Sequence, residues 1–316
     1  MKEPVTISVV SPVYKAVGCV EELYRRIRQA LESIEPKLSY EIVLVEDDGR
    51  DGSWEKMVEL ASRDPRLRVA RLSRNFGQHP AITAGLSLTE GEWVVVMDCD
   101  LQDPPEDIPR LYAKALEGYD IVAARRGKRK DPFWKRFTSR LFLLFFNWLS
   151  GMSNDPEIAN FRIVSRLVAD AYLNMKEITP SFGAHLEWLG FSVGYIDIHH
   201  QPRYSGKSSY SFRKLLRLAA NNIVAYSNKP LYISISVGFF MSFFSTLYAL
   251  YLVLKKYWVG VTIDGWTSLM VSIWFLGGMV IANLGIIGLY LGKVYSETKG
   301  RPQYVIARSV NCDEKK

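Results

Sequence analysis

The sequence predicts an α/β domain with a mostly parallel sheet, followed by interfacial amphipathic helices and a C-terminal pair of membrane-spanning helices. Over the first 125 residues, short apolar runs alternate with amphipathic stretches, which is the pattern of a parallel sheet covered by helices. Residues 231–254 and 267–292 then contain no charged residue. Each is longer than the ~20 apolar residues that a helix needs to cross a membrane. These segments exclude an ordinary soluble enzyme.

Five strands and four helices are expected in the α/β part. The strands are expected over residues 5–10, 41–45, 68–72, 93–97 and 121–124, and the first should end at Ser11-Pro12. The helices are expected over residues 21–34, 54–61, 81–88 and 104–116. Polar residues follow the strand ends at Ser11, Glu46, Ser73 and Asp98. Ligands bind at the carboxyl ends of strands in open α/β sheets, so the functional site is expected at these residues.

Two further segments are expected to form helices at the membrane surface. Residues 132–149 place aromatic and leucine side chains on one helical face, with basic residues in the N-terminal half. Residues 211–227 carry three basic residues before an apolar end. The alternative for the first segment is a helix buried against the domain.

Positive charge is concentrated beside the first of these segments. The chain has 40 Lys and Arg against 33 Asp and Glu, a net charge of +7. Residues 125–140 alone hold eight basic residues and one acidic residue, so the rest of the chain sums to zero. This distribution indicates a membrane surface or a polyanionic substrate, and nucleic acid is not an expected partner.

The distribution of Lys and Arg also predicts the orientation in the membrane. Residues 201–230 and 293–316 hold six each, whereas the connection between the uncharged segments holds Lys255 and Lys256. Both ends of the hairpin are therefore expected in the cytoplasm. Three widely spaced cysteines suit a reducing compartment, and the six-residue apolar run before Pro12 is too short for a signal peptide.

The strongest chemical motif is the run from Asp98 to Glu106, which reads DCDLQDPPE. Asp98 and Asp100 directly follow an apolar strand, so both can bend toward one point at the sheet edge. Carboxylate oxygens suit Mg²⁺ or Mn²⁺, which proteins often bind through one or two carboxylates plus substrate phosphates. Asp103 is expected to be the N-cap of the next helix, with Pro104 at the first position.

Two more motifs could contact a nucleotide. The turn from Glu46 to Ser53 (EDDGRDGS) places carboxylates where they could accept hydrogen bonds from a base or a ribose. The alternative is a surface turn in which Asp51 or Ser53 caps a helix. The run from Arg203 to Tyr210 (RYSGKSSY) could clamp a diphosphate, although Gln201 rules out a Walker-type loop. The four histidines lack metal-ligand spacing, and no hydrolase or dinucleotide motif is present.

Together, the strings SPVY, EDDGRDGS, RNFGQH, MDCDLQDPPE and RYSGKSSY resemble the polyprenyl-phosphate glycosyltransferases of glycosyltransferase family 2. The resemblance covers nearly the whole chain, including the C-terminal helix pair of bacterial members. It implies a GT-A fold and inverting transfer from a nucleotide sugar to polyprenyl (undecaprenyl) phosphate, with glucose from UDP-glucose as the first expectation. It also implies a bacterial inner-membrane enzyme of cell-envelope glycan modification, and a homo-oligomer such as a tetramer is expected.

The resemblance also implies roles for individual residues. The catalytic residues would be Asp98, Asp100, Arg125 and Arg203. The nucleotide would be contacted by Pro12, Val13, Tyr14, Glu46, Asp47 and Asp98. The Mg²⁺ or Mn²⁺ ligands would be Asp98, Asp100 and Gln102, and the acceptor-phosphate contacts Arg125, Arg126, Arg203 and Lys207. The parts of the chain would be 1–130 (nucleotide sugar), 131–230 (acceptor, with the interfacial helices), 231–292 (two membrane helices) and 293–316 (cytoplasmic tail).

The chain departs from the family pattern at Asn160, where many members have Asp before a Phe-Arg pair. A phosphate monoester has its second pKa near 6, so the acceptor is mostly a dianion at neutral pH and needs little deprotonation. A general base is therefore optional. The alternative functions are a processive polysaccharide synthase, for which two membrane helices make a poor channel, and a non-catalytic membrane-tethered lipid-binding module.

Overall fold

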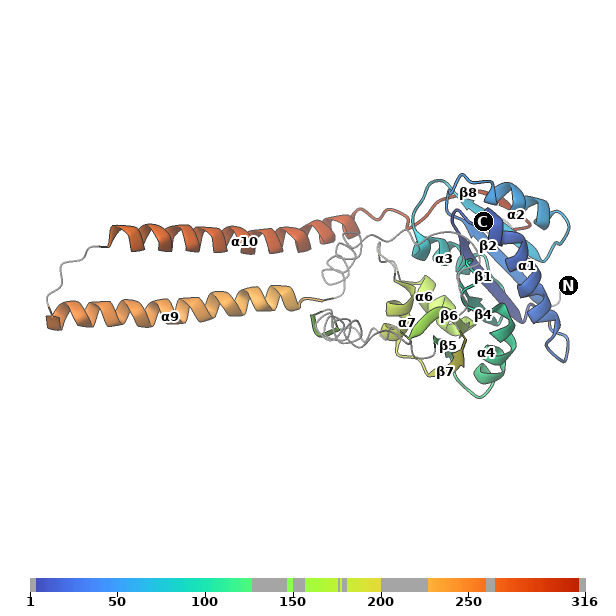
Figure 1. Cartoon of the computed structure of the whole chain (residues 1–316), viewed down its shortest axis with the longest axis horizontal. Coiled ribbons are helices and arrows are strands. Elements are labelled where there is room, and N and C mark those ends of the chain that lie inside the picture. The colour runs from blue at the N-terminus through green and yellow to red at the C-terminus, as the bar shows by residue number, and fades with distance from the viewer. Residues whose placement is uncertain are drawn as a thin grey trace. The chain divides into compact units, whose positions relative to one another are not determined.

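The computed structural model describes residues 4–126, 147–149, 157–175, 177, 181–199, 227–259 and 265–312. The chain divides into two compact units: a sheet domain (residues 1–131, 155–209 and 301–316) and a helical unit (residues 132–154 and 210–300). Figure 1 shows the sheet of the first unit and the two long helices of the second. The two expected membrane-surface helices lie mostly outside the described residues. Only residues 147–149 of the first and residue 227 of the second are described.

Eight strands form one sheet in the order β7-β5-β6-β4-β1-β2-β3-β8. Neighbouring strands are parallel except where β6 meets β4 and β5, and where β8 meets β3. The carboxyl ends of the other six strands therefore lie at one edge. The strands are β1 (Ile7–Val13), β2 (Tyr40–Glu46), β3 (Leu67–Leu72), β4 (Trp93–Val96), β5 (Ile121–Arg126), β6 (Ile158–Ser165), β7 (Val193–Ile198) and β8 (Ile306–Val310). The predicted mostly parallel α/β sheet is confirmed.

Helices cover both faces of the sheet (Figure 1). One face packs against α1 (Val17–Glu32), α2 (Ser53–Ala61), the 3₁₀ helix η1 (Pro105–Asp107) and α4 (Ile108–Ala115). The opposite face packs against α3 (Gln78–Ser87), α6 (Arg166–Leu173) and α7 (Phe182–Leu189). Every residue of β1 and β2 is buried, as expected for central strands of a sheet that is covered on both faces.

Several element boundaries differ from the prediction; α1, for example, begins four residues before its expected start. β1 continues through Pro12 to Val13, because the fixed φ of proline is compatible with an extended strand. Backbone hydrogen bonding between β1 and the chain after β2 continues beyond Pro12, where the N–H of Asp47 donates to the carbonyl of Val13 (2.9 Å). The helix expected over 104–116 is instead η1 followed by α4. Helix α3 begins at Gln78, three residues before its expected start.

The C-terminal segment, predicted to be a cytoplasmic tail, also supplies an edge strand of the sheet, which was not predicted. β8 pairs antiparallel with β3. The side-chain amide of Asn311 donates to the carbonyls of Ala61 (2.8 Å) and Leu67 (2.9 Å), and Arg68 Nε donates to the Asn311 carbonyl (3.2 Å). The prediction missed β8 because a five-residue strand that pairs with a partner over 200 residues away leaves no strong local pattern.

The helical unit contains α9 (Lys229–Val259) and α10 (Trp266–Thr298), which lie side by side (Figure 1). Lys229–Tyr248 and Val271–Thr298 are long and apolar enough to cross a membrane, and neither stretch is buried inside the chain. Large apolar side chains on these helices are open to the surroundings, including Phe239 (75% exposed) and Trp274 (80% exposed). Such surfaces are typical of helices that face lipid. The two expected membrane-spanning helices therefore have the required length and surface.

A first prediction concerns the attachment of β8. Asn311→Ala removes the side-chain amide and places alanine at a φ of 58°, a left-handed conformation that alanine disfavours. We expect the free energy of unfolding of the sheet domain to fall by roughly 2 kcal/mol. Chemical denaturation of the detergent-solubilised chain, followed by tryptophan fluorescence, measures this loss. Ser309→Ala, at an exposed position in β8, is the control. Equal stabilities for the two variants would contradict the prediction.

Candidate functional site

Most of the predicted site residues that the structure describes lie at the carboxyl edge of the sheet. This edge carries the ends of β1, β2, β4 and β5 and, because β6 is antiparallel, the beginning of β6. At the end of β1, Pro12 and Val13 are buried in the strand and only Tyr14 exposes its side chain (47% exposed). Arg203 and Lys207 lie outside the described residues.

Asp98 follows β4 and is held by side-chain amides from two other elements. Gln78 Nε2 donates to Asp98 Oδ1 (2.6 Å), and Asn160 Nδ2 lies 3.5 Å from the same oxygen. Burial, together with the nearby carboxylates of Asp100 and Asp103, raises the pKa of Asp98 to about 6. A cation placed among these carboxylates would stabilise their negative charge.

Asp100 sits in the tight turn that follows Asp98. Its Oδ1 accepts the backbone N–H of Gln102 (3.2 Å), and Leu101 between them has a positive φ of 58°. Among the described residues, no cluster of three or more His, Cys, Asp or Glu side chains could hold a metal ion without other ligands. The two carboxylates nevertheless fit Mg²⁺ or Mn²⁺, because such ions often take one or two carboxylates and complete their coordination with substrate phosphates.

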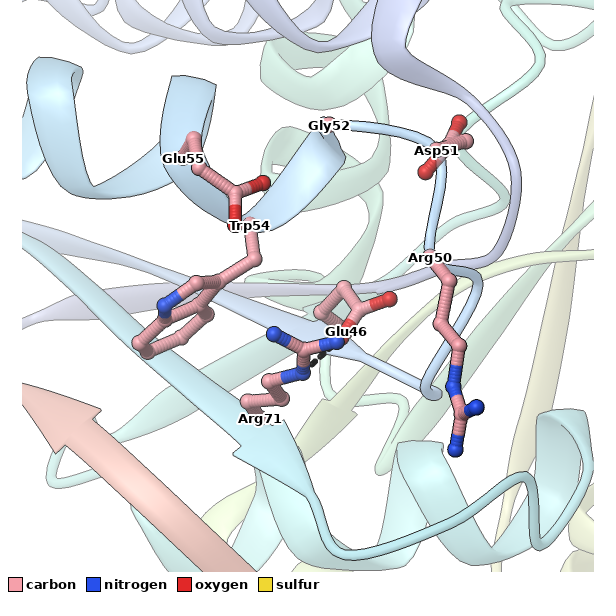
Figure 2. A pocket seen from close by; sticks show the side chains of 7 residues that line it. All are labelled: Glu46, Arg50, Asp51, Gly52, Trp54, Glu55 and Arg71. Atoms are coloured by element: carbon pink, nitrogen blue, oxygen red, sulfur yellow. Dashed lines mark ion pairs between the residues drawn. The ribbon is translucent and has the colours of Figure 1, made fainter.

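A hollow of about 260 Å³ opens beside Glu46. Figure 2 shows its lining side chains: Glu46, Arg50, Asp51, Gly52, Trp54, Glu55 and Arg71. Glu46 is 1% exposed, and its Oε2 lies 3.0 Å from Arg71 Nε in an ion pair. Burial raises the pKa of Glu46, while the N–H of Gly49 donates to Oε1. A carboxylate acceptor and a guanidinium donor thus stand side by side in the wall of this hollow.

The structure separates Asp47 from Glu46, although the two are adjacent in sequence. Asp47 is 3% exposed. Its Oδ1 accepts the N–H of Phe76 (2.7 Å) and its Oδ2 accepts the N–H of Gly77 (2.9 Å). Glu46 faces the hollow next to α2, whereas Asp47 faces the loop that leads into α3. Both carboxylate oxygens of Asp47 therefore bind the chain's own backbone.

Asp51 binds the beginnings of two helices, although the N-cap of α2 is Gly52 rather than Asp51 or Ser53. Its Oδ1 accepts the N–H of Ser53 (3.2 Å), the first residue of α2, and its Oδ2 accepts the N–H of Val17 (3.1 Å), the first residue of α1. One carboxylate thus joins the beginnings of two helices. This contact orders the turn that carries Glu46.

Arg125 and Arg126, both predicted to contact the acceptor phosphate, point to opposite faces because they are consecutive in β5. Arg125 lies over the ring of Tyr195 in β7, with 4.6 Å between the guanidinium carbon and the ring centroid. Arg126 instead binds Asp103 through two hydrogen bonds of 3.0 and 2.8 Å. Only Arg125 has its guanidinium on the face that also carries Asn160.

The prediction that Asp103 is the N-cap of a helix is wrong. Pro104 occupies the position before η1, and the Asp103 carboxylate, 3% exposed, pairs with Arg126. A bidentate guanidinium–carboxylate pair is stronger than a hydrogen bond from one backbone N–H group. Asp103 therefore binds Arg126 rather than a backbone N–H of the following helix. The prediction failed because Arg126 lies 23 residues away in sequence.

Arg162 is a buried cation that the sequence analysis did not single out. It is 7% exposed, donates to the carbonyl of Ala159 (2.9 Å) and lies 5.6 Å from the ring centroid of Phe182. Burial lowers its pKa to about 10, an effect that the nearby Asp98 carboxylate partly offsets. The available signal was an arginine in the apolar run that forms β6. Its positive charge contributes to the electrostatic environment of Asp98.

The chain is similar to known glycosyltransferases along nearly its whole length. The family model described as glycosyl transferase family 2 matches residues 8–171. A bactoprenol glucosyl transferase of Shigella phage SfX is 34% identical over 95% of this chain and 98% of the relative. An undecaprenyl-phosphate 4-deoxy-4-formamido-L-arabinose transferase of Pseudomonas aeruginosa (strain LESB58) is 34% identical over 97% of this chain and 91% of the relative.

An uncharacterized glycosyltransferase of Bacillus subtilis (strain 168), YkcC, is 34% identical over 100% of this chain and 98% of the relative. Among solved structures, glucosyl-3-phosphoglycerate synthase from Mycobacterium tuberculosis with Mn²⁺, UDP and product is 18% identical, with a TM-score of 0.48. That similarity covers 71% of this chain and 79% of the other.

A second prediction separates the two neighbouring arginines by stability. Arg126→Ala leaves the buried Asp103 carboxylate without its bidentate partner, so we expect the free energy of unfolding to fall by roughly 2–3 kcal/mol. Denaturant titration measures this loss. The control is Arg110→Ala, which removes an exposed guanidinium and should change stability by less than about 0.5 kcal/mol. Unchanged stability of the Arg126 variant would show that the pair with Asp103 is dispensable.

Proposed function

We propose a reaction for this chain from the premise that it belongs to glycosyltransferase family 2, whose model spans residues 8–171. The chain transfers a sugar from a nucleotide sugar to a polyprenyl phosphate at the cytoplasmic face of the membrane. The observation that carries the proposal is the Asp98–Asp100 turn at the carboxyl edge of the sheet, in a chain that also has two helices suited to span a membrane. The relatives named for bactoprenol and undecaprenyl phosphate support this class of acceptor.

The pairing of β8 supports a chain that crosses the membrane twice. The chain leaves the sheet domain before α9, and after α10 it returns to pair β8 with β3. If α9 spans the membrane, α10 must span it in the opposite direction. The Lys and Arg distribution then favours the cytoplasm for the sheet domain and both termini. A homo-oligomer, such as a tetramer packed through α9 and α10, accords with these helices.

The hollow beside Glu46 supports a pyrimidine nucleotide as the donor. Glu46 and Arg71 are paired with each other in the wall of this hollow, and exchange of part of this pairing for the adjacent N–H and C=O groups of uracil would hold the base there. The exposed ring of Tyr14, at the end of the neighbouring strand β1, offers an apolar face to the base or ribose. UDP-glucose remains the first donor to test.

Asp98 and Asp100, with the Gln102 side chain, would hold Mg²⁺ or Mn²⁺ together with the donor diphosphate. When bound, the cation neutralises the negative charge that develops on the leaving nucleoside diphosphate. The chain itself fixes the position of the two carboxylates that would hold the cation. Gln78 and Asn160 orient Asp98, and the turn at Leu101 orients Asp100.

The attacking group is the acceptor phosphate, which approaches the anomeric carbon from the side opposite the leaving diphosphate and inverts its configuration. Because this phosphate is mostly a dianion at neutral pH, attack requires little proton transfer. The neutral amide of Asn160 beside Asp98 is compatible with such a reaction. Arg125, supported by the ring of Tyr195, would hold the acceptor phosphate close to the donor, where two anions would otherwise repel each other.

A third prediction tests the reaction itself. The purified chain with undecaprenyl phosphate, Mg²⁺ or Mn²⁺ and a panel of nucleotide sugars, beginning with UDP-glucose, should form a lipid-linked sugar detectable by mass spectrometry. Asp100→Ala should lower turnover by at least about 100-fold if Asp100 accepts the cation. Asp170→Ala, on the exposed surface of α6, is the matched control and should retain activity. No product with any sugar, from folded protein, rejects the proposal.

A fourth prediction tests the acceptor contact. Arg125→Ala should raise the KM for undecaprenyl phosphate about tenfold or more while the donor KM changes little, because a charge-assisted hydrogen bond to the acceptor phosphate is lost. Initial rates at varied acceptor and donor concentrations measure both constants. Arg110→Ala serves as the exposed-arginine control. A rise confined to the donor KM would assign Arg125 to the nucleotide sugar instead.

A further inference from the structure

The first turn of α3 is attached at two points of the carboxyl edge, and the two attachments form one chain of contacts. At one end, Asp47 binds the backbone of the loop that enters α3. At the other end, Gln78, the first residue of α3, binds Asp98 at the end of β4. The contacts therefore run from the end of β2, through the loop, to the predicted metal and nucleotide ligand.

The attachment at Asp47 fixes the point where the chain turns into the helix. Its carboxylate accepts the N–H groups of Phe76 and Gly77, and its carbonyl accepts Asn75 Nδ2 (3.2 Å). Gly77 has a φ of 103°, a conformation that favours glycine. Two charge-assisted bonds to consecutive amides leave this loop little freedom to move.

The body of α3 is equally fixed, so the position of Gln78 is well determined. Gly85 packs so closely on β1 that a Cβ at this position would lie 2.3 Å from Val10 Cγ1. Near the start of the helix, His79 Nδ1 accepts the N–H of Phe182 (3.3 Å) from α7. A helix held at both ends against the sheet can present the side chain of its first residue accurately.

The contact with Gln78 selects one oxygen of Asp98. Gln78 Nε2 and Asn160 Nδ2 both approach Oδ1. Among the residues that the structure describes, none donates a hydrogen bond to Oδ2. The terminal torsion of an aspartate is broad and does not fix the carboxylate plane by itself. Two amides on one oxygen therefore determine where the other oxygen points.

We propose that Asp47 and Gln78 are positioning residues, which act in series to orient Asp98 so that its Oδ2 faces the cation and the nucleotide diphosphate. This inference rests on the proposed role of Asp98 as a ligand. It assigns Asp47 to the support of the site rather than to direct contact with the base or ribose. Residues that orient a metal ligand typically change metal affinity or activity by about 10- to 100-fold when they are replaced.

The test measures Mn²⁺ binding in the presence of UDP, by electron paramagnetic resonance titration of the full detergent-solubilised chain. Gln78→Ala and Asp47→Asn should each weaken Mn²⁺ binding about 10- to 100-fold. Gln78→Asn, which keeps the amide on a shorter side chain, should fall between Gln78→Ala and the unaltered chain. Gln29→Ala, which removes an exposed glutamine from α1, is the matched control and should bind Mn²⁺ normally.

The double variant Asp47→Asn/Gln78→Ala tests whether the two residues act in series. We expect the double variant to bind Mn²⁺ about as weakly as whichever single variant binds it more weakly. The reason is that the effects of two substitutions in one connected series of contacts do not add. If the two effects multiply, and if Asp47→Asn also weakens UDP binding without metal, Asp47 contacts the nucleotide directly and the inference is overturned. Because Gln78 is exposed, its variants keep the packing of α3 and test the orientation of Asp98 even if Asp47→Asn does not fold.

The outcomes separate this inference from the proposed function. If the unaltered chain binds no Mn²⁺ with UDP, the proposed metal role of Asp98 fails and the inference fails with it. If the unaltered chain binds Mn²⁺ and both Gln78 variants bind it equally well, only the positioning role is rejected. Turnover at saturating Mn²⁺ adds a second readout, because a positioning role predicts that excess cation restores much of the lost rate.

Discussion

The arrangement of the site depends on negative charge collected in one turn after β4. Asp98, Asp100 and Asp103 lie within six residues, and burial with mutual repulsion raises the pKa of Asp98 to about 6. Neighbouring side chains reduce this repulsion between the carboxylates in two ways. Arg126 neutralises Asp103 from β5, and the amides of Gln78 and Asn160 hold Asp98 without neutralising it. The turn therefore keeps negative charge that could bind a cation together with a diphosphate.

The sequence predicted those parts of the site that depend on local pattern. Alternating apolar and amphipathic runs located the strands, and two carboxylates after an apolar strand located the acidic turn. It did not predict partners that are distant in the chain. Asp103 looked like a helix cap but binds Arg126, the partners of Asp47 in the loop before α3 were not foreseen, and the pairing of β8 with β3 left no local trace. Each of these features is a contact between residues that are distant in sequence, and such a contact leaves no signature among the neighbouring residues.

The same fold accounts for a reaction between a water-soluble donor and a lipid acceptor. The residues proposed to contact the donor lie at the carboxyl edge of the sheet domain, and Arg125 lies at the same edge, over the ring of Tyr195. In the part of the chain that the structure describes, Lys229–Tyr248 and Val271–Thr298 are not buried and are suited to lipid. β8 follows the second helix in the chain and pairs with β3 of the sheet domain.

The central claim is that a divalent cation at Asp98 and Asp100 joins the nucleotide to the protein. Isothermal titration of UDP into the full chain, with Mn²⁺ and then with excess EDTA, tests this claim most directly. The account predicts that chelation weakens UDP binding at least about tenfold, because Asp98 and Asp100 would lose the cation through which they would hold the diphosphate. Equal UDP affinity in the two titrations would contradict it.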